Sequence, residues 1–247
     1  MNHTFQTIDK IPLGLETMSP ALLEAQNYHE WNYQWVKPYL SGRLLDIGGG
    51  TGNHIRFLES FQLTSIDLSD ECIHMLANKY ERLPHWNFIQ GDITDEKLVE
   101  KLGPASFDTV LSCNVFEHIP DDQKAARLSA HLLRKGGKIV LLLPAHENLY
   151  GNMDKLAGHF RRYNKKTARI LLEQAGFKVE VLRYVNLLGG IGWFVNNRIL
   201  KHDHLSSPSV NSQIRLFDRY LIPLMRFLEG KRSMPFGQSL VCVGKML

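Results

Sequence analysis

The sequence is poor in cysteine and has no long apolar run. Its 247 residues include three cysteines, Cys72, Cys113 and Cys242, which lie far apart and form no CxxC pair. Neither a disulfide framework nor a thiolate zinc site is therefore expected, and a reducing compartment fits this cysteine usage. The longest apolar stretches, Ile139 to Leu143 and Leu187 to Val195, are well short of the ~20 residues that cross a bilayer. No membrane span is expected, although contact with a membrane surface stays open.

The chain also lacks a strong charge excess and a leader-like start. It carries 29 basic and 25 acidic residues, so its formal net charge is only +4. Because a nucleic-acid footprint needs cations clustered on one face, this excess predicts no nucleic-acid partner. The first ten residues, MNHTFQTIDK, contain neither a basic nor an apolar region, so secretion by a signal peptide is not expected. Together these features favour a cytoplasmic protein.

What the sequence does contain is a regular alternation of short apolar runs and amphipathic segments. Several of the runs are apolar throughout, as in strands that are buried on both faces. Repeated alternation of strands and helices produces right-handed crossovers, so the sequence predicts an α/β, doubly wound domain with a parallel sheet. The expected strands are Arg43 to Ile47, Leu63 to Asp67, Trp86 to Gln90, Phe107 to Ser112, Lys138 to Leu143, Phe177 to Tyr184 and Leu240 to Lys245.

The helices between these strands can be placed by their expected ends. Ser69 is suited to cap one helix, and Asn164 to cap another that reaches Ala175. A helix that includes Leu133 is expected to stop at Gly136-Gly137.

The length favours one domain with a large appendage rather than two equal domains. We expect a single domain over residues 1–247 with four parts: an N-terminal cap region with a helix from Pro20 to about Leu40 (1–42), a core (43–185), a helical insertion rich in aromatic, leucine and arginine residues (186–238) and a final strand (239–247).

A glycine-rich loop follows the first strand. It reads Asp46-Ile47-Gly48-Gly49-Gly50-Thr51-Gly52, and a helix containing Ile55, Phe57 and Leu58 is expected after it. Glycines let the backbone turn tightly and let a ligand lie against it. The loop lacks the GK[ST] ending of a phosphate-binding P-loop, and Asn53 stands where the dinucleotide pattern needs glycine. The Asp46 carboxylate suits a neighbouring ammonium group better than a pyrophosphate.

This loop resembles the first motif of class I S-adenosylmethionine-dependent methyltransferases, and the resemblance extends along most of the chain. It implies that Asp46, Gly48, Gly50 and Gly52 form the cofactor loop. It also implies that Asp67, followed by Leu68, accepts the ribose hydroxyls and that Asp92 and Ile93 hold the adenine. Cys113-Asn114-Val115-Phe116-Glu117-His118 resembles the motif at the methionine end of the cofactor, and His118 is expected to order that pocket. Leu133-Arg134-Lys135-Gly136-Gly137-Lys138 resembles the turn into the fifth strand.

The family resemblance carries expectations for fold and chemistry. It implies a Rossmann-like, mostly parallel seven-stranded sheet whose last strand is antiparallel. It implies a methyltransferase that uses S-adenosylmethionine, releases S-adenosylhomocysteine and needs no metal. The acceptor is expected to be a small or lipid-like molecule methylated on O, N or C. The alternative is a noncatalytic partner subunit that binds the same cofactor.

The segment after the fifth strand resembles a pattern over the acceptor pocket in a bacterial subgroup of this family. Within Gly158-His159-Phe160-Arg161-Arg162-Tyr163, His159 is the candidate general base, because imidazole titrates near neutral pH. The alternative is that His159 and Arg161 only tie the loop to Asp154 or to the adjacent helix. Arg162 is a candidate partner for a substrate anion, or else a structural arginine. The expected substrate-binding residues are Tyr28, Trp31, Tyr150, Arg162, Tyr163 and Trp193.

The insertion at residues 186–238 supplies more apolar surface than a connection in a sheet requires. Its helices can close over an apolar acceptor as a lid, form a homodimer surface, or lie on an anionic membrane. His202 and His204 form an HDH cluster, but no further ligands accompany them at a recognisable spacing, so no metal site is expected there.

Overall fold

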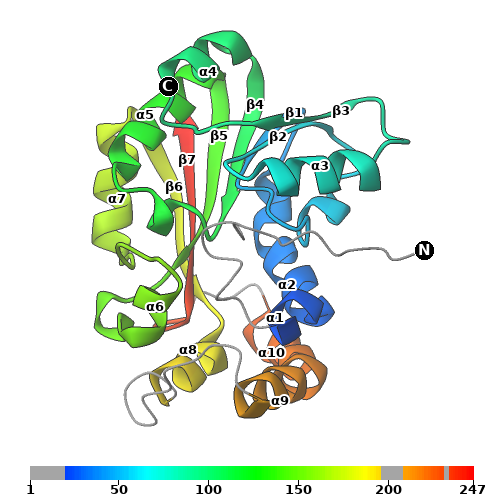
Figure 1. The fold of residues 1–247 in the computed structure, drawn as a ribbon. Helices are drawn as coiled ribbons and strands as arrows, with labels where there is room; N and C mark the ends of the chain where they lie inside the picture. The colour runs from blue at the N-terminus through cyan, green and yellow to red at the C-terminus, as the bar shows by residue number, and fades with distance from the viewer. Residues whose placement is uncertain (1–19, 196–207, 231–233) are drawn as a thin grey trace, which may run out of the picture.

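The computed structural model describes residues 20–195, 208–230 and 234–247, and these ranges build one mixed sheet of seven strands (Figure 1). The strand order is β3-β2-β1-β4-β5-β7-β6. Strands β1 to β5 pair in parallel, whereas β7 runs antiparallel to both β5 and β6. The strands are β1 (Arg43–Ile47), β2 (Gln62–Asp67), β3 (Trp86–Gln90), β4 (Phe107–Cys113), β5 (Leu133–Pro144), β6 (Phe177–Val185) and β7 (Ser239–Met246). The predicted Rossmann-like sheet with an antiparallel last strand is confirmed.

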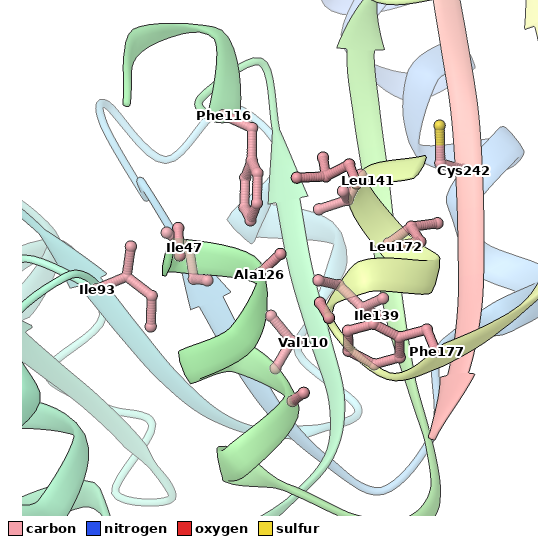
Figure 2. Packing of buried hydrophobic residues seen from close by; sticks show 14 of the residues in the cluster. Ile47, Ile93, Val110, Phe116, Ala126, Ile139, Leu141, Leu172, Phe177 and Cys242 are labelled. Atoms are coloured by element: carbon pink, nitrogen blue, oxygen red, sulfur yellow. The ribbon is translucent and has the colours of Figure 1, made fainter. Parts of the chain in front are cut away.

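Helices cover both faces of the sheet. One face carries α4 (Glu96–Leu102), α5 (Asp122–Leu132) and α7 (Lys165–Gln174), which pack on it through a cluster that includes Val110, Ile139 and Phe177 (Figure 2). The other face carries α2 (Gln26–Val36) and α3 (Asp70–Lys79), with Trp31 and Trp35 in its apolar cluster. Burial on both faces explains why the central strands are apolar throughout.

Two predicted helix caps are present. The Ser69 side chain accepts a hydrogen bond from the backbone N–H of Cys72 at the start of α3. The Asn164 side chain accepts from the backbone N–H groups of Lys166 and Thr167 at the start of α7. These bonds satisfy donors that have no partner within the first turn of a helix.

Three sequence predictions about helices were wrong in detail. The N-terminal helix breaks at Ala25 into α1 (Pro20–Glu24) and α2, and ends in a 3-10 turn, η1 (Lys37–Tyr39). The glycine loop leads only to a 3-10 turn, η2 (Ile55–Phe57), because the chain enters β2 soon afterwards. Helix α5 ends at Leu132, since Leu133 already pairs with Phe107 of β4 and the following residues up to Lys138 form an irregularity in the ladder.

The described part of the insertion lies beyond one end of the sheet. It contains α8 (Leu187–Phe194), α9 (Pro208–Leu216), the π-helical turn η6 (Phe217–Leu221) and α10 (Ile222–Glu229). Of these, α9 packs against α1, and η6 and α10 pack against α2, whereas α8 follows the end of β6 (Figure 1). The buried Glu229 carboxylate accepts hydrogen bonds from the backbone N–H groups of Asn186 and Leu187, at 3.0 and 2.7 Å. This contact ties the end of α10 to the start of α8. None of the described helices has the length and apolar character needed to cross a membrane.

Candidate functional site

A cavity of about 1600 Å³ lies at the carboxyl ends of β1, β2 and β4. One side is formed by the glycine loop, the end of β2, residues 91–93 and residues 113–118. The other side is formed by α2, the segment from Tyr150 to Arg162, α8 and part of the α9–η6 region. Open parallel sheets bind their ligands at this edge. The cavity therefore joins the predicted cofactor residues to the predicted acceptor region.

The glycine loop is shaped by positive φ angles and by close packing. Gly48 has a φ of +80°, and a Cβ there would lie 2.3 Å from Val115. Gly50 has a φ of +51°, with no atom within 4 Å of its Cβ position, and lines the cavity. Its backbone N–H donates to Asp67 at 2.8 Å. Gly52 does not line the cavity, because it closes the turn through a hydrogen bond to Gly49 and packs on α3.

The predicted ribose and adenine residues stand at neighbouring strand ends. Asp67 lines the cavity, and its carboxylate also accepts the Ser69 backbone N–H at 2.9 Å. Each carboxylate oxygen can accept more than one hydrogen bond, so Asp67 keeps capacity for ligand hydroxyls. Leu68, Asp92 and Ile93 line the same region. The loop geometry of Asp92 is fixed by the Thr94 N–H, which donates to it at 2.7 Å.

Asp46 does not occupy the place expected from the sequence. Its carboxylate is fully buried and outside the cavity lining, and its oxygens contact the His54 ring at 2.7 Å and the Ser65 hydroxyl at 2.8 Å. His54 lies between Asp46 and the cavity, which it lines. Burial by itself would lower the pKa of His54, but the charge and hydrogen bond of Asp46 outweigh it, so this pKa is raised. The direct contact of Asp46 with a ligand ammonium was therefore a wrong expectation.

The strand-end motif after β4 brings Cys113, Asn114 and His118 to the cavity. Asn114 has a φ of +56°, and its backbone N–H donates to Leu142 at 2.8 Å, which holds the turn out of β4. Burial, reinforced by the neighbouring His159, lowers the pKa of His118 to about 4. His118 is therefore a neutral ring at physiological pH, in keeping with the pocket-ordering role expected for it.

His159 is held by one carboxylate and faces another. Its Nδ1 lies 2.9 Å from Asp154, whose other neighbour is the Arg162 guanidinium, with Nε donating at 2.7 Å. Its Nε2 lies 3.9 Å from Glu117 in the turn η3 (Phe116–His118). Burial opposes ionisation of Asp154, but hydrogen bonds from His159 and the charge of Arg162 hold its pKa below the usual value. In the neutral His159 ring, an ionised Asp154 fixes the N–H on Nδ1 and leaves Nε2 as an acceptor.

The predicted structural ties of this loop are also present. Arg161 donates to the backbone carbonyls of Ile119 and Pro120 and pairs with Asp122. Arg162 is buried against Asp154 and the carbonyl of Ala145, so its charge is already used inside the protein. These contacts match the structural alternative for Arg162, and a contact with a substrate anion stays a prediction. Arg162 also lines the cavity, where its guanidinium lies over the Trp193 ring.

Aromatic side chains from separate elements form the acceptor side. Tyr28 of α2, Tyr150 and Trp193 of α8 line the cavity. Trp31 does not, because it is only 2% exposed and packs in the core against Trp35. Tyr163 is also absent from this lining, since its hydroxyl donates to Asp122 at 2.7 Å on the α5 side. Both were wrong as residues lining this cavity.

Comparison with known proteins places the cofactor half in a family. A family model described as a methyltransferase domain matches residues 45–141. A ubiquinone biosynthesis O-methyltransferase of Xanthomonas euvesicatoria pv. vesicatoria is 35% identical over 126 residues, which cover 48% of this chain and 50% of the relative. The chain thus matches about half the length of its curated relative.

Solved methyltransferases share the fold over nearly the whole chain. A possible histamine N-methyltransferase of Thermotoga maritima superposes with a TM-score of 0.61 at 16% identity, over 92% of each chain. A Haemonchus contortus phosphoethanolamine N-methyltransferase, solved with S-adenosyl-L-methionine, gives 0.60 at 16% identity, over 91% of this chain and 56% of that one. Residues 45–141 therefore match the methyltransferase domain family, and the chain as a whole shares the fold of solved methyltransferases.

The residues on one side of the cavity are compatible with S-adenosylmethionine, the cofactor of such methyltransferases. The open space over Gly50 leaves room for a ligand against the backbone, and Asp67 and Asp92 stand at adjacent strand ends beside it. This is the placement that recognition of a ribose and an amino-purine requires.

The sequence alone missed three residues of the site. His54 follows the glycine loop, and it was missed because the loop motif consists of glycines and an acid and includes no histidine. Glu117 was quoted only as part of a motif, although a carboxylate that follows a buried strand is a usable signal. Asp218 of η6 accepts the Tyr28 backbone N–H at 2.7 Å and joins the insertion to α2, a long-range contact without a local signal.

Metal binding is not tested by these contacts. Glu117, His118 and His159 bring ligand atoms within 4.8 Å of one another, a group found among the described residues. His202 and His204 lie outside the described residues. The expectation that no metal is needed stays a prediction.

Proposed function

We propose that this protein transfers the methyl group of S-adenosylmethionine to an O, N or C atom of a small or lipid-like acceptor. The observation that carries the proposal is that one cavity is lined both by the glycine loop with Asp67 and Asp92 and by His159 with Tyr28 and Trp193. Bound S-adenosylmethionine would supply an electrophilic methyl group on a sulfonium. The protein's task is then to hold an acceptor atom in line with that methyl.

Each of the proposed cofactor residues contacts one part of S-adenosylmethionine and so holds it in place. The backbone of Gly48 and Gly50 lies against the methionine part, and Asp67 accepts the ribose hydroxyls. Asp92 and Ile93 hold the adenine, and the segment from Cys113 to His118 closes the methionine end. The family match over residues 45–141 supports these roles.

His54 is the proposed contact for the methionine carboxylate. Its ring lies on the cavity wall, and Asp46 behind it raises the pKa of the ring, which favours the positive form. A cationic ring attracts a carboxylate and repels an ammonium, so this position suits the acidic end of the amino acid. Asp46 then acts through His54.

The insertion is proposed to wall the acceptor pocket. Trp193 and Phe217 from the insertion face the same cavity as Tyr28 of α2. An apolar wall excludes water and selects the acceptor by shape. We keep residues 1–247 as one methyltransferase domain with cap region, cofactor core, insertion and final strand as its parts. A homodimer surface or membrane contact on the exposed side of the insertion, a cytoplasmic location and the lack of a nucleic-acid partner stay predictions.

His159 is the proposed general base where the acceptor carries a proton. Asp154 fixes its tautomer, and Nε2 is left to accept the proton as the acceptor atom attacks the methyl. The ties of this loop also give His159 a structural role. Its catalytic role therefore requires a kinetic test.

The function is tested by a search for the methyl acceptor in cell extracts. A deletion strain is profiled for a metabolite that lacks one methyl group, and its extract is incubated with the purified protein and methyl-labelled S-adenosylmethionine. Transfer of label to a metabolite missing from the control supports the enzyme. A protein that binds the cofactor but labels nothing in any extract would be the noncatalytic partner subunit.

A further inference from the structure

Glu117 has a buried carboxylate that no other side chain in the described part of the chain satisfies. Its side chain is 1% exposed, and neither carboxylate oxygen has a hydrogen-bond partner among the described residues. The residue lines the cavity together with the strand-end residues Cys113 and Asn114 and with His159, whose Nε2 is 3.9 Å from it. A buried polar group without a partner is costly, and such a group in a native site points to a ligand.

No side chain among the described residues donates a hydrogen bond to the Glu117 carboxylate. The His159 Nε2 is 3.9 Å from a Glu117 oxygen, which is too far for a hydrogen bond. Because the other ring nitrogen, Nδ1, donates to Asp154, Nε2 of the neutral ring is an acceptor. The His118 ring stands perpendicular to His159, with centroids 4.6 Å apart. When Glu117 is ionised and His159 is neutral, the carboxylate and Nε2 are both acceptors, and no described side chain donates to the carboxylate.

We propose that Glu117 and His159 together bind a hydrogen-bond donor of the methyl acceptor, a hydroxyl or an amine. This inference rests on the proposed function, and it narrows the acceptor to molecules with an O–H or N–H at the reacting end. A carboxylate or phosphate at this point would face the Glu117 carboxylate and is disfavoured. Glu117 is then a specificity residue for the acceptor.

The arrangement also provides a base for the proton that the acceptor O–H or N–H loses during methyl transfer. As the lone pair of the acceptor O or N forms the new bond to the methyl carbon, the carbon–sulfur bond breaks and sulfur keeps its electron pair. The proton of the acceptor moves to His159 Nε2. The resulting imidazolium lies between two carboxylates, Asp154 and Glu117, which stabilise its charge.

The test needs no knowledge of the acceptor, because one cofactor analogue carries its own donor. Sinefungin has an amine-bearing carbon in place of the sulfonium, so its amine projects toward the reacting acceptor atom, whereas S-adenosylhomocysteine has none. The two ligands are titrated calorimetrically into the full-length protein, with a chelator present throughout. The variants are Glu117→Gln and, as a matched control, Glu173→Gln on the surface of α7.

Wild type and Glu173→Gln should bind sinefungin at least about tenfold more tightly than S-adenosylhomocysteine, the scale of a hydrogen bond to a charged group. In Glu117→Gln this ratio should fall to within about twofold while the affinity for S-adenosylhomocysteine is kept. Burial raises the pKa of Glu117 to about 7, so the sinefungin preference of wild type should grow from pH 6 to pH 8. Glu117→Gln should show no such growth.

Other outcomes overturn the inference. Equal affinities for the two ligands in wild type, or a full sinefungin preference in Glu117→Gln, would exclude a donor at Glu117. A preference that appears only when the chelator is replaced by zinc would assign the group to a metal ion instead. Failure of both ligands to bind wild type would contradict the proposed function itself. Melting curves at pH 8 check folding, and Glu117→Gln should melt no lower than wild type because it removes an unsatisfied buried carboxylate.

Discussion

The two halves of the cavity are built in different ways. The cofactor half uses short segments that each follow one strand: the glycine loop after β1, Asp67 at the end of β2 and Asp92 after β3. The acceptor half joins α2, the loop that carries His159 and the insertion, which are far apart in the sequence. The sheet therefore fixes the first half directly, whereas the second depends on long-range contacts such as that of Asp218 with Tyr28. We infer that the first half sets the cofactor and the second half sets the acceptor.

The largest expected effect is a loss of turnover on substitution of His159, which belongs to the acceptor half of the cavity. His159→Ala should lower turnover about 100-fold or more, the usual contribution of positioned proton transfer, while cofactor affinity is kept. The measurement is transfer of labelled methyl to the acceptor, with calorimetry of S-adenosylhomocysteine beside it. His131→Ala, which removes an exposed histidine side chain from α5, is the matched control.

A second variant guards against a purely structural effect. His159→Asn keeps a donor for Asp154 but cannot accept the proton in the same way. If it restored turnover to within a few-fold of wild type, His159 would be only a tie for its loop.

The next effect belongs to the cofactor half. Asp67→Ala should weaken S-adenosylmethionine binding by about 1.5 to 3 kcal/mol, because hydrogen bonds to a charged acceptor are lost. Calorimetry on this variant and on Glu100→Ala, which removes an exposed carboxylate of α4, gives the comparison. Unchanged affinity in a folded Asp67→Ala protein would remove Asp67 from the cofactor site.

A smaller effect tests whether the insertion is a wall. Trp193→Ala should raise the acceptor KM by roughly tenfold, the scale of losing one apolar contact surface, and leave cofactor affinity alone. The control is Phe227→Ala on α10, whose side chain is 84% exposed and away from the cavity lining. Steady-state kinetics are measured beside sedimentation.

Sedimentation distinguishes a pocket wall from a dimer surface as the role of the insertion. If Phe227→Ala changed the sedimenting mass while Trp193→Ala left the acceptor kinetics as in wild type, the insertion would be a dimer surface rather than a wall.

The smallest expected effect is the pH dependence of cofactor affinity. His54 has a raised pKa, so its ring is positive below that value and loses its charge as the pH rises through it. Affinity for S-adenosylmethionine should therefore fall a few-fold between pH 6.5 and pH 9 in wild type, on the scale of one exposed ion pair. Calorimetry should find a flatter profile in His54→Asn. The same slope in both proteins would exclude His54 as the carboxylate contact.

The sequence predicted the cofactor half well because its signals are local. A strand, a glycine loop and an acid at the next strand end are read within a few residues, and Asp67, Asp92 and Gly50 all reach the cavity. The prediction for Asp46 was wrong because the sequence does not show that the chain turns back after the loop. This turn brings the His54 ring into hydrogen-bond contact with the Asp46 carboxylate.

The acceptor half was predicted less well for a physical reason. Tyr28 and Trp31 lie on the same stripe of α2, yet Tyr28 lines the cavity and Trp31 packs in the core. Which of the two faces a ligand depends on how α2 is placed against η6 and the sheet, and periodicity alone carries no such information. In the same way, Arg162 and Tyr163 could be given roles only after their partners Asp154 and Asp122 were known.

The central claim is that the glycine-loop half of the cavity is a site for S-adenosylmethionine. Calorimetric titration of wild type with S-adenosylmethionine, NAD and ATP under one set of conditions tests it most directly. The account predicts saturable binding of S-adenosylmethionine at one site per chain and much weaker binding of NAD and ATP, because the loop lacks a phosphate-binding pattern. Absence of S-adenosylmethionine binding, or equal binding of NAD or ATP, would contradict it.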